Sequence, residues 1–131
     1  MAEAVLAQAL AGTPGLRVES AGFNALVGRP ADPTSIALMQ ERGLSIEAHR
    51  ARQFTADMAR DFELILVMEQ GHVNAVAQLS PTSRGKIFRL GKWSDFDIPD
   101  PYRRPRMEFE RALSLIDKGV VDLKKVMGHA G

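Results

Sequence analysis

The sequence predicts an open α/β fold in which a parallel sheet carries helices on both faces. The first observation is order: helical apolar stripes alternate with short strand-like runs, as helix, strand, helix, strand, helix, strand, helix. The second is the run at residues 64–68, five apolar residues without alternation. Such a run is typical of a strand that is covered on both faces of a parallel sheet.

The first third of the chain predicts a helix, a strand and a second helix. Residues 1–11 carry an apolar stripe at helical spacing but no N-cap residue. Residues 16–21 alternate between apolar and polar side chains, as a half-buried strand does. Asp32 is a suitable cap for a helix that begins with Pro33, and Gly43 is a suitable end for it.

The remainder predicts two further strands and two long helices. Thr55 can cap a short helical turn, residues 69–79 predict a helix, and residues 86–90 predict a strand. A last helix is expected from about residue 105 almost to the end of the chain. Its apolar stripe steps by four and three residues through Phe109, Leu113, Ile116, Val120, Leu123 and Met127.

Composition indicates one globular domain, residues 1–131. The chain is 45% hydrophobic and 25% charged, and its formal net charge of +1 provides no field for nucleic acid or for an anionic membrane. No apolar run approaches the roughly 20 residues of a membrane span, and no secretory signal is visible. We therefore expect a cytoplasmic protein.

The absence of cysteine excludes disulfides, thiolate metal sites and a cysteine nucleophile within the 131 residues. The three histidines, His49, His72 and His129, lie far apart and show no ligand spacing. We expect neither a metal nor a cofactor.

Asp100 stands between Pro99 and Pro101, with Tyr102 two residues on. Proline fixes φ and favours an extended predecessor, so this carboxylate is expected on a stiff loop. An acid held beside an aromatic ring is suited to protonate a departing oxygen, although an ordinary turn before a helix explains the same residues. In open α/β sheets the site lies beyond the carboxyl ends of the strands. We expect residues 20–22, residues 68–69 and the Asp100 loop to meet there.

Six motifs, in order and spanning most of the chain, resemble the low-molecular-weight protein-tyrosine-phosphatases, in particular the bacterial enzymes linked to capsule and exopolysaccharide production. They are Met1-Ala2-Glu3-Ala4, Ser20-Ala21-Gly22, Gly28-Arg29-Pro30-Ala31-Asp32-Pro33, His49-Arg50-Ala51-Arg52-Gln53, Ile65-Leu66-Val67-Met68-Glu69 and Ile98-Pro99-Asp100-Pro101-Tyr102-Arg103. The family's first motif reads C-x-G-N-x-C-R-S-P-x-A-E, and residues 1–3 match its end. The resemblance therefore predicts an N-terminally incomplete domain that lacks the first strand, the phosphate-binding loop and the nucleophilic cysteine.

The resemblance implies hydrolysis of phosphotyrosine through a phosphocysteine intermediate. Asp100 is the expected general acid, and Tyr102 is expected to flank the substrate ring. Arg103 stands where some members carry a second aromatic residue; it is a candidate for contacts with acidic residues beside the phosphotyrosine or a solvated side chain. Ser20 and His49 match residues that brace the phosphate loop. Because the nucleophile is absent, the 131-residue chain is expected to be inactive.

The expected partner is a phosphotyrosine-containing protein, by resemblance a bacterial tyrosine autokinase. Two other functions remain open: a non-catalytic binding or regulatory domain that retains the phosphatase fold, and thiol-dependent arsenate reduction, which no cysteine supports. Losing one interior strand would remove roughly 6–15 kcal/mol of gross burial. Because this is close to the stability of a whole domain, we expect a marginal fold that self-associates through exposed sheet edges.

Overall fold

The structure, a computed structural model, describes residues 1–23 and 25–128. Its sheet contains two parallel strands, β1 (Ile65–Val67) and β2 (Ile87–Arg89), paired in the register Ile65↔Ile87. The connection runs through α4 (Gln70–Leu79) and the 3₁₀-helix η1 (Pro81–Lys86). Parallel strands require such a crossover, so the predicted strand–helix–strand unit is confirmed.

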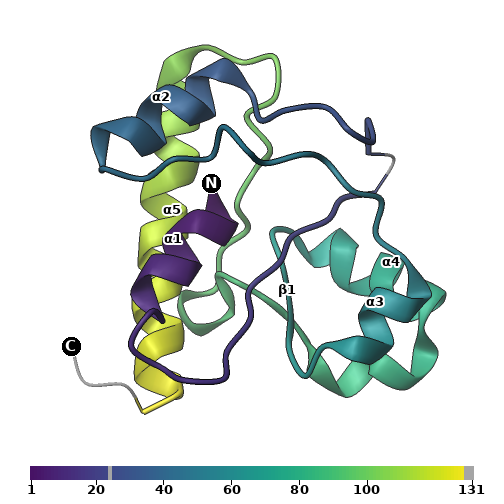
Figure 1. Ribbon diagram of the computed structural model, residues 1–131. Helices are drawn as coiled ribbons and strands as arrows, with labels where there is room; N and C mark the ends of the chain where they lie inside the picture. The colour runs from purple at the N-terminus through teal and green to yellow at the C-terminus, as the bar shows by residue number, and fades with distance from the viewer. Residues whose placement is uncertain (24, 129–131) are drawn as a thin grey trace.

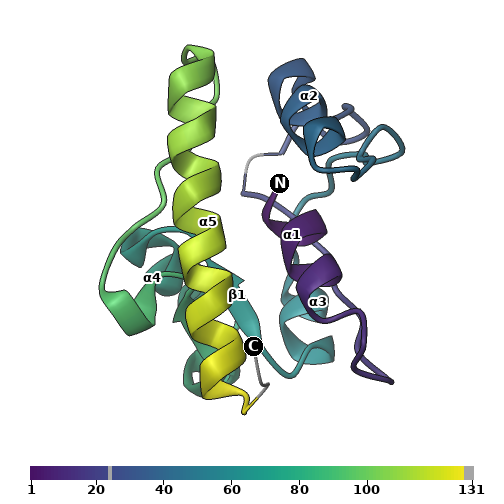
Figure 2. The ribbon, with the colours of Figure 1, turned by 90° about the vertical axis from the view of Figure 1, so that its left-hand side faces the viewer.

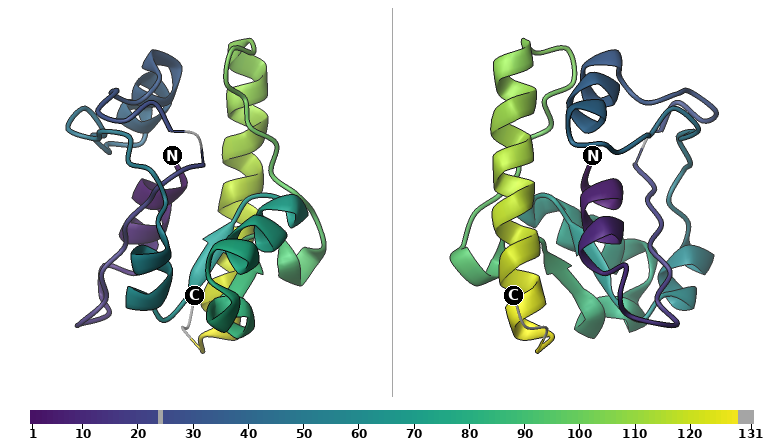
Figure 3. Two further views of the ribbon diagram at one scale, coloured as in Figure 1. Left: turned by 90° about the vertical axis from the view of Figure 1, so that its right-hand side faces the viewer. Right: turned by 60° about the vertical axis from the view of Figure 1, so that its left-hand side comes forward.

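Helices cover both faces of this sheet (Figures 2 and 3), as the unalternated run of β1 predicts. Ile65 and Val67 belong to a buried cluster with Ala59 of α3 (Ala56–Asp61) and Val76 of α4. Leu66, which points to the opposite face, packs against the second cluster, formed largely by α5 (Arg106–Val126) and its neighbours. The α/β class is therefore confirmed.

The last helix is the longest element and supports two shorter helices (Figure 1). α2 (Pro33–Glu41) lies beside its N-terminal half, and α1 (Ala2–Ala9) lies beside its middle. Most of the predicted apolar stripe of α5 is buried, namely Phe109, Leu113, Ile116, Val120 and Leu123. Met127, the last member of the stripe, is 38% exposed.

Both predicted N-caps form. The side chain of Asp32 accepts a hydrogen bond from the backbone N–H of Thr34 at 2.8 Å, at the start of α2. The Thr55 hydroxyl accepts one from the N–H of Met58 at 3.2 Å. Thr55 thereby begins α3, a six-residue helix, where the sequence predicts only a short turn.

The predicted strand at residues 16–21 is wrong. Within residues 1–23 and 25–128, no backbone–backbone hydrogen bond joins this segment to another, and β1 pairs with β2 alone. A strand exists only when a neighbour supplies donors and acceptors, whatever its side-chain pattern. The segment instead crosses the molecule as an unpaired trace (Figure 1).

The loop after β2 is fixed to the last helix. Ser94, in the 3₁₀-helix η2 (Lys92–Ser94), donates its hydroxyl to Asp122 of α5 at 2.5 Å, and Lys118 donates to the other oxygen at 3.0 Å. The hydrogen bond from Ser94, followed by that from Lys118, holds the pKa of Asp122 below its usual value. The segment that carries Asp100 is therefore anchored to α5 shortly after it leaves the sheet.

The unpaired outer edge of β1 leads us to predict concentration-dependent association of the 131-residue chain, because exposed strand edges pair with other chains. Sedimentation velocity over a range of concentrations should show oligomers that increase with concentration. A monomer that unfolds in one cooperative thermal transition would contradict this prediction.

Gly119 in α5 packs closely against Leu90. A Cβ atom there would lie 2.7 Å from Cγ of Leu90 and 2.8 Å from its carbonyl oxygen. Gly119→Ala should therefore lower the free energy of unfolding by about 1–3 kcal/mol through overpacking, despite a helix-propensity gain of about 1 kcal/mol. Urea denaturation measures this change.

The matched control is Gly71→Ala in α4, where nothing lies within 4 Å of the added atom. That variant should be at least as stable as the parent chain. Equal behaviour of the two variants would show that the contact between the helix and Leu90 is not tight.

Candidate active site

A pocket of about 410 Å³ lies where three segments distant in the sequence meet. The first segment is residues 20–25, the second is residues 49–52, and the third is the loop that contains Asp100. Its lining consists of Ser20, Ala21, Gly22, Ala25, His49, Ala51, Arg52, Asp100 and Tyr102. The expected meeting of residues 20–22 with the Asp100 loop is therefore found.

Backbone hydrogen bonds join the first two segments. The N–H of Gly22 donates to the carbonyl of Arg52, and the N–H of Phe54 donates to the carbonyl of Gly22, both at 2.9 Å. Further along, the N–H of Ala51 donates to the carbonyl of Arg29 at 2.8 Å. Because these bonds use main-chain atoms, they fix the positions of the pocket walls independently of most side chains.

The Asp100 loop is anchored on the sheet and turns sharply at the pocket. The N–H of buried Ile98 donates to the carbonyl of Met68, just after β1, at 2.9 Å. One carboxylate oxygen of Asp100 then accepts the N–H of Tyr102 at 3.0 Å. Asp100 is exposed and lines the pocket, and it is not covered by the terminal helix. This is the placement that a proton donor needs.

Tyr102 belongs to the pocket lining, whereas Arg103 does not. The ring of Tyr102 lines the pocket and is 51% exposed. The guanidinium carbon of Arg103 lies 5.3 Å from the centre of that ring, within the range of a cation–π contact. Arg103 is therefore held at the rim, beside the pocket rather than in its wall.

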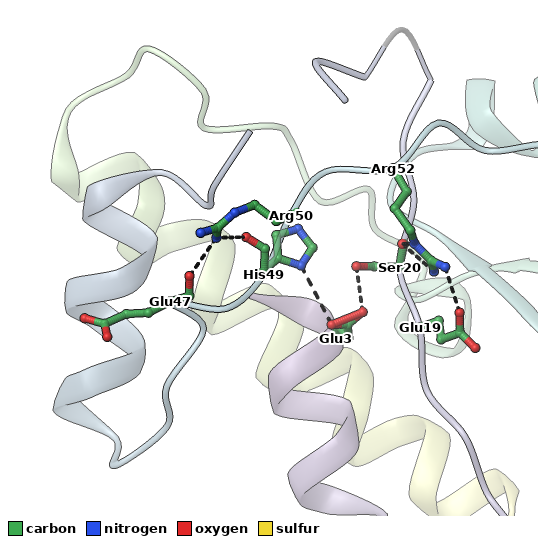
Figure 4. Close-up of polar contacts among 7 residues, drawn as sticks. All are labelled: Glu3, Glu19, Ser20, Glu47, His49, Arg50 and Arg52. Atoms are coloured by element: carbon green, nitrogen blue, oxygen red, sulfur yellow. Dashed lines mark hydrogen bonds and ion pairs between the residues drawn. The ribbon is translucent and has the colours of Figure 1, made fainter. Parts of the chain in front are cut away.

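Ser20 and His49 both approach Glu3, the acidic residue in the first turn of α1 (Figure 4). The Ser20 hydroxyl donates to one carboxylate oxygen of Glu3 at 2.8 Å, and Nδ1 of His49 lies 3.9 Å from the other. Glu3 was not among the site residues expected from the sequence. Its place at the end of the first family motif was the signal that could have found it.

Arg52 is a second residue that sequence reasoning missed as a site residue, although it stands in the fourth motif. Its guanidinium donates to the carbonyl oxygen of Ser20 at 3.0 and 3.3 Å and pairs with Glu19 at 2.9 Å (Figure 4). Arg52 thus fixes the main chain at Ser20 in the pocket wall.

One expectation differs from the structure. Residues 68–69 do not line the pocket; Met68 contributes only the carbonyl that anchors Ile98. His72 is half-buried, with its ring 5.7 Å from that of Phe23. In the described part of the chain no three metal-ligating side chains gather, and His129 lies outside the described residues.

Comparison with known proteins identifies the family to which this arrangement belongs. The family described as low molecular weight phosphotyrosine protein phosphatase matches residues 1–130. The chain belongs to this family.

No helix within residues 1–23 and 25–128 has the length and apolar character of a membrane span.

Bacterial relatives agree with this assignment. A probable low molecular weight protein-tyrosine-phosphatase of Ralstonia solanacearum, EpsP, is 45% identical over 120 residues, which cover 92% of this chain and 81% of EpsP. The Escherichia coli K12 phosphatase Wzb is 43% identical over 106 residues, which cover 80% of this chain and 72% of Wzb. The chain is thus similar to the bacterial capsule-type phosphatases, as the six motifs indicate.

Solved structures support the fold. Vibrio vulnificus Wzb in complex with benzylphosphonate has a TM-score of 0.86 at 38% identity, covering 95% of this chain and 86% of Wzb. Wzb from Escherichia coli K30 in complex with sulphate has a TM-score of 0.88 at 33% identity, covering 96% and 87%.

The hydrogen bond between Ser20 and Glu3 should measurably couple α1 to the pocket wall. Ser20→Ala should lower the free energy of unfolding by about 1 kcal/mol, the typical net value of such a bond. A double-mutant cycle with Glu3→Ala, followed by urea denaturation, isolates the pairwise part from the helix-terminus effect of Glu3. Strictly additive changes would show that the two side chains do not interact in solution.

Proposed function

We propose that this chain forms the part of an active site that carries the general acid, and that this site hydrolyses phosphotyrosine in proteins. The supporting observation is the exposed carboxylate of Asp100, which lines a pocket of about 410 Å³ beside the ring of Tyr102. A phenol has a pKa of about 10, so its oxygen departs far more easily when an acid protonates it. Asp100 is the general acid of this proposal.

The proposed reaction has two steps, as the family resemblance implies. A cysteine thiolate attacks phosphorus, the bond to the tyrosine oxygen breaks, and Asp100 transfers its proton to that oxygen. Water then attacks the phosphocysteine, Asp100 accepts a proton from that water, and thiolate and phosphate separate. Splitting one displacement in this way makes each step easier.

The other pocket residues have supporting roles in this proposal. Tyr102 flanks the phenyl ring of the substrate, and Ser20 and His49 position the phosphate-binding loop together with Glu3. Arg52, which is paired with Glu19, holds the main chain at Ser20 in the pocket wall. The complexes of related Wzb enzymes with benzylphosphonate and with sulphate support a site for an aromatic phosphate monoester.

The 131 residues contain no cysteine, so we propose that they do not turn over phosphotyrosine by themselves. The proposed substrate of the complete site is a phosphotyrosine-containing protein, by resemblance a bacterial tyrosine autokinase, in the cytoplasm. The same absence favours the second candidate function, a non-catalytic binding or regulatory domain that retains the phosphatase fold.

A chimera separates these functions. An N-terminal segment with the family's C-x-G-N-x-C-R-S-P motif is joined to Met1, and phosphate release from phenyl phosphate is measured. The chimera should be active, and Asp100→Asn should reduce its kcat by about 10²–10⁴-fold, the typical contribution of a general acid. The loss should be smaller with 4-nitrophenyl phosphate, whose phenolate leaves more easily without a proton.

The control is Asp61→Asn, which removes an exposed carboxylate at the end of α3, outside the pocket. That variant should keep the activity of the chimera. An inert chimera that is correctly folded would refute the enzyme proposal and favour the binding domain. If Asp100→Asn lowered kcat equally with both substrates, Asp100 would not be the general acid.

A further inference from the structure

The arginines of the molecule divide into two groups. Most of those in the described chain pair with a carboxylate within 4.0 Å: Arg17, Arg42, Arg52, Arg60, Arg89, Arg106 and Arg111. Arg103 and Arg104 have no such carboxylate partner among the described residues, and both are exposed. Their charges are therefore available to an external group.

These two arginines directly follow Tyr102, which lines the pocket, in the sequence. The other arginines without a carboxylate partner among the described residues are Arg29, Arg50 and Arg84. Arg29 is exposed and absent from the pocket lining, and its carbonyl oxygen accepts the N–H of Ala51. Arg50 donates to the main-chain carbonyls of Glu47 and His49 at 2.8 and 2.7 Å, so its guanidinium braces its own loop. Arg84 is exposed on η1, which contributes nothing to the pocket lining.

The backbone holds Arg103 in a conformation that few side chains favour. The N–H of Arg104 donates to the carbonyl of Pro101 at 2.8 Å, which closes a four-residue turn with Arg103 in its third position at φ +63°. Glycine or asparagine normally occupies such a position. Non-glycine residues in this conformation cluster at functional sites, and Arg103 adopts it directly after Tyr102, which lines the pocket. Asp95 adopts it too, at φ +54°, but lies outside the pocket lining.

The cation–π contact ties that side chain to the substrate pocket. With its guanidinium carbon 5.3 Å from the centre of the Tyr102 ring, Arg103 is kept beside the aromatic wall instead of extending freely into solvent. Its charge thus lies beside the ring of Tyr102, at the edge of the pocket.

We propose that Arg103 and Arg104 recognise carboxylate side chains next to the phosphotyrosine, so that the enzyme prefers acidic segments of its protein substrates. Arg52 in the described pocket lining is already paired with Glu19, and Asp100 carries its proton when substrate binds in the proposed reaction. Two neighbouring arginines without acidic partners therefore make the local charge positive. The inference rests on the proposed phosphatase function and names its substrate class.

The test compares two phosphotyrosine peptides, one with glutamate and one with glutamine at the two positions on each side of the phosphotyrosine. With the cysteine-containing chimera, kcat/KM should be about three- to tenfold higher for the glutamate peptide at moderate ionic strength, as expected for two exposed ion pairs. The preference should decrease as salt is added.

The variant Arg103→Gly/Arg104→Gln should abolish this preference. Glycine is favoured at the φ of residue 103, so the variant should retain the thermal midpoint of the parent, which excludes unfolding as the cause. Arg84→Gln removes one equivalent charge away from the pocket and should preserve the preference.

Each outcome is decisive. An active chimera without a glutamate preference, or one whose preference survives in the double variant, overturns this inference and leaves the phosphatase function standing. If Arg84→Gln lost the glutamate preference to the same extent, the preference would depend on the net charge of the protein, and the inference would also be overturned. An inert chimera overturns both proposals together.

Discussion

The close contact between α5 and the end of β2 is the constraint on which the site depends. Gly119 lets the helix approach Leu90 so tightly that a methyl group would collide with it. The loop that carries Asp100 leaves the sheet just after Leu90, so this contact fixes the start of the loop to the body of α5. Ile98, buried and hydrogen-bonded to Met68, adds a second anchor. A rigid support of this kind allows an exposed carboxylate to keep its position.

Elsewhere the pocket is held by polar contacts between distant segments. Glu3 contacts Ser20 and His49, and Arg52 joins the main chain at Ser20 to Glu19. None of these side chains is deeply buried, so each contact is worth little alone. Together they connect α1 to both walls of the pocket, which explains how a site can form from segments with almost no regular secondary structure.

Features encoded locally could be predicted from the sequence, whereas features that depend on distant partners could not. The prolines around Asp100 restrict the backbone directly, and Asp32 and Thr55 act within one helical turn. The alternation of residues 16–21 predicts which side chains would face inward in a strand, but it carries no information on whether a neighbouring strand is present, and Leu16 is exposed. Glu3 was missed for a related reason: helical periodicity identifies an apolar stripe, and a carboxylate that binds a residue 17 positions away leaves no such signature.

The hydrogen bond within the Asp100 turn has a stereochemical consequence. The two oxygens of a carboxyl group are chemically equivalent in solution, but here one of them is occupied by the N–H of Tyr102. The loop thereby breaks the symmetry of the group. In the proposed reaction the same single oxygen releases the proton in the first half and recaptures one in the second, so no rotation of the carboxyl is required between the two half-reactions.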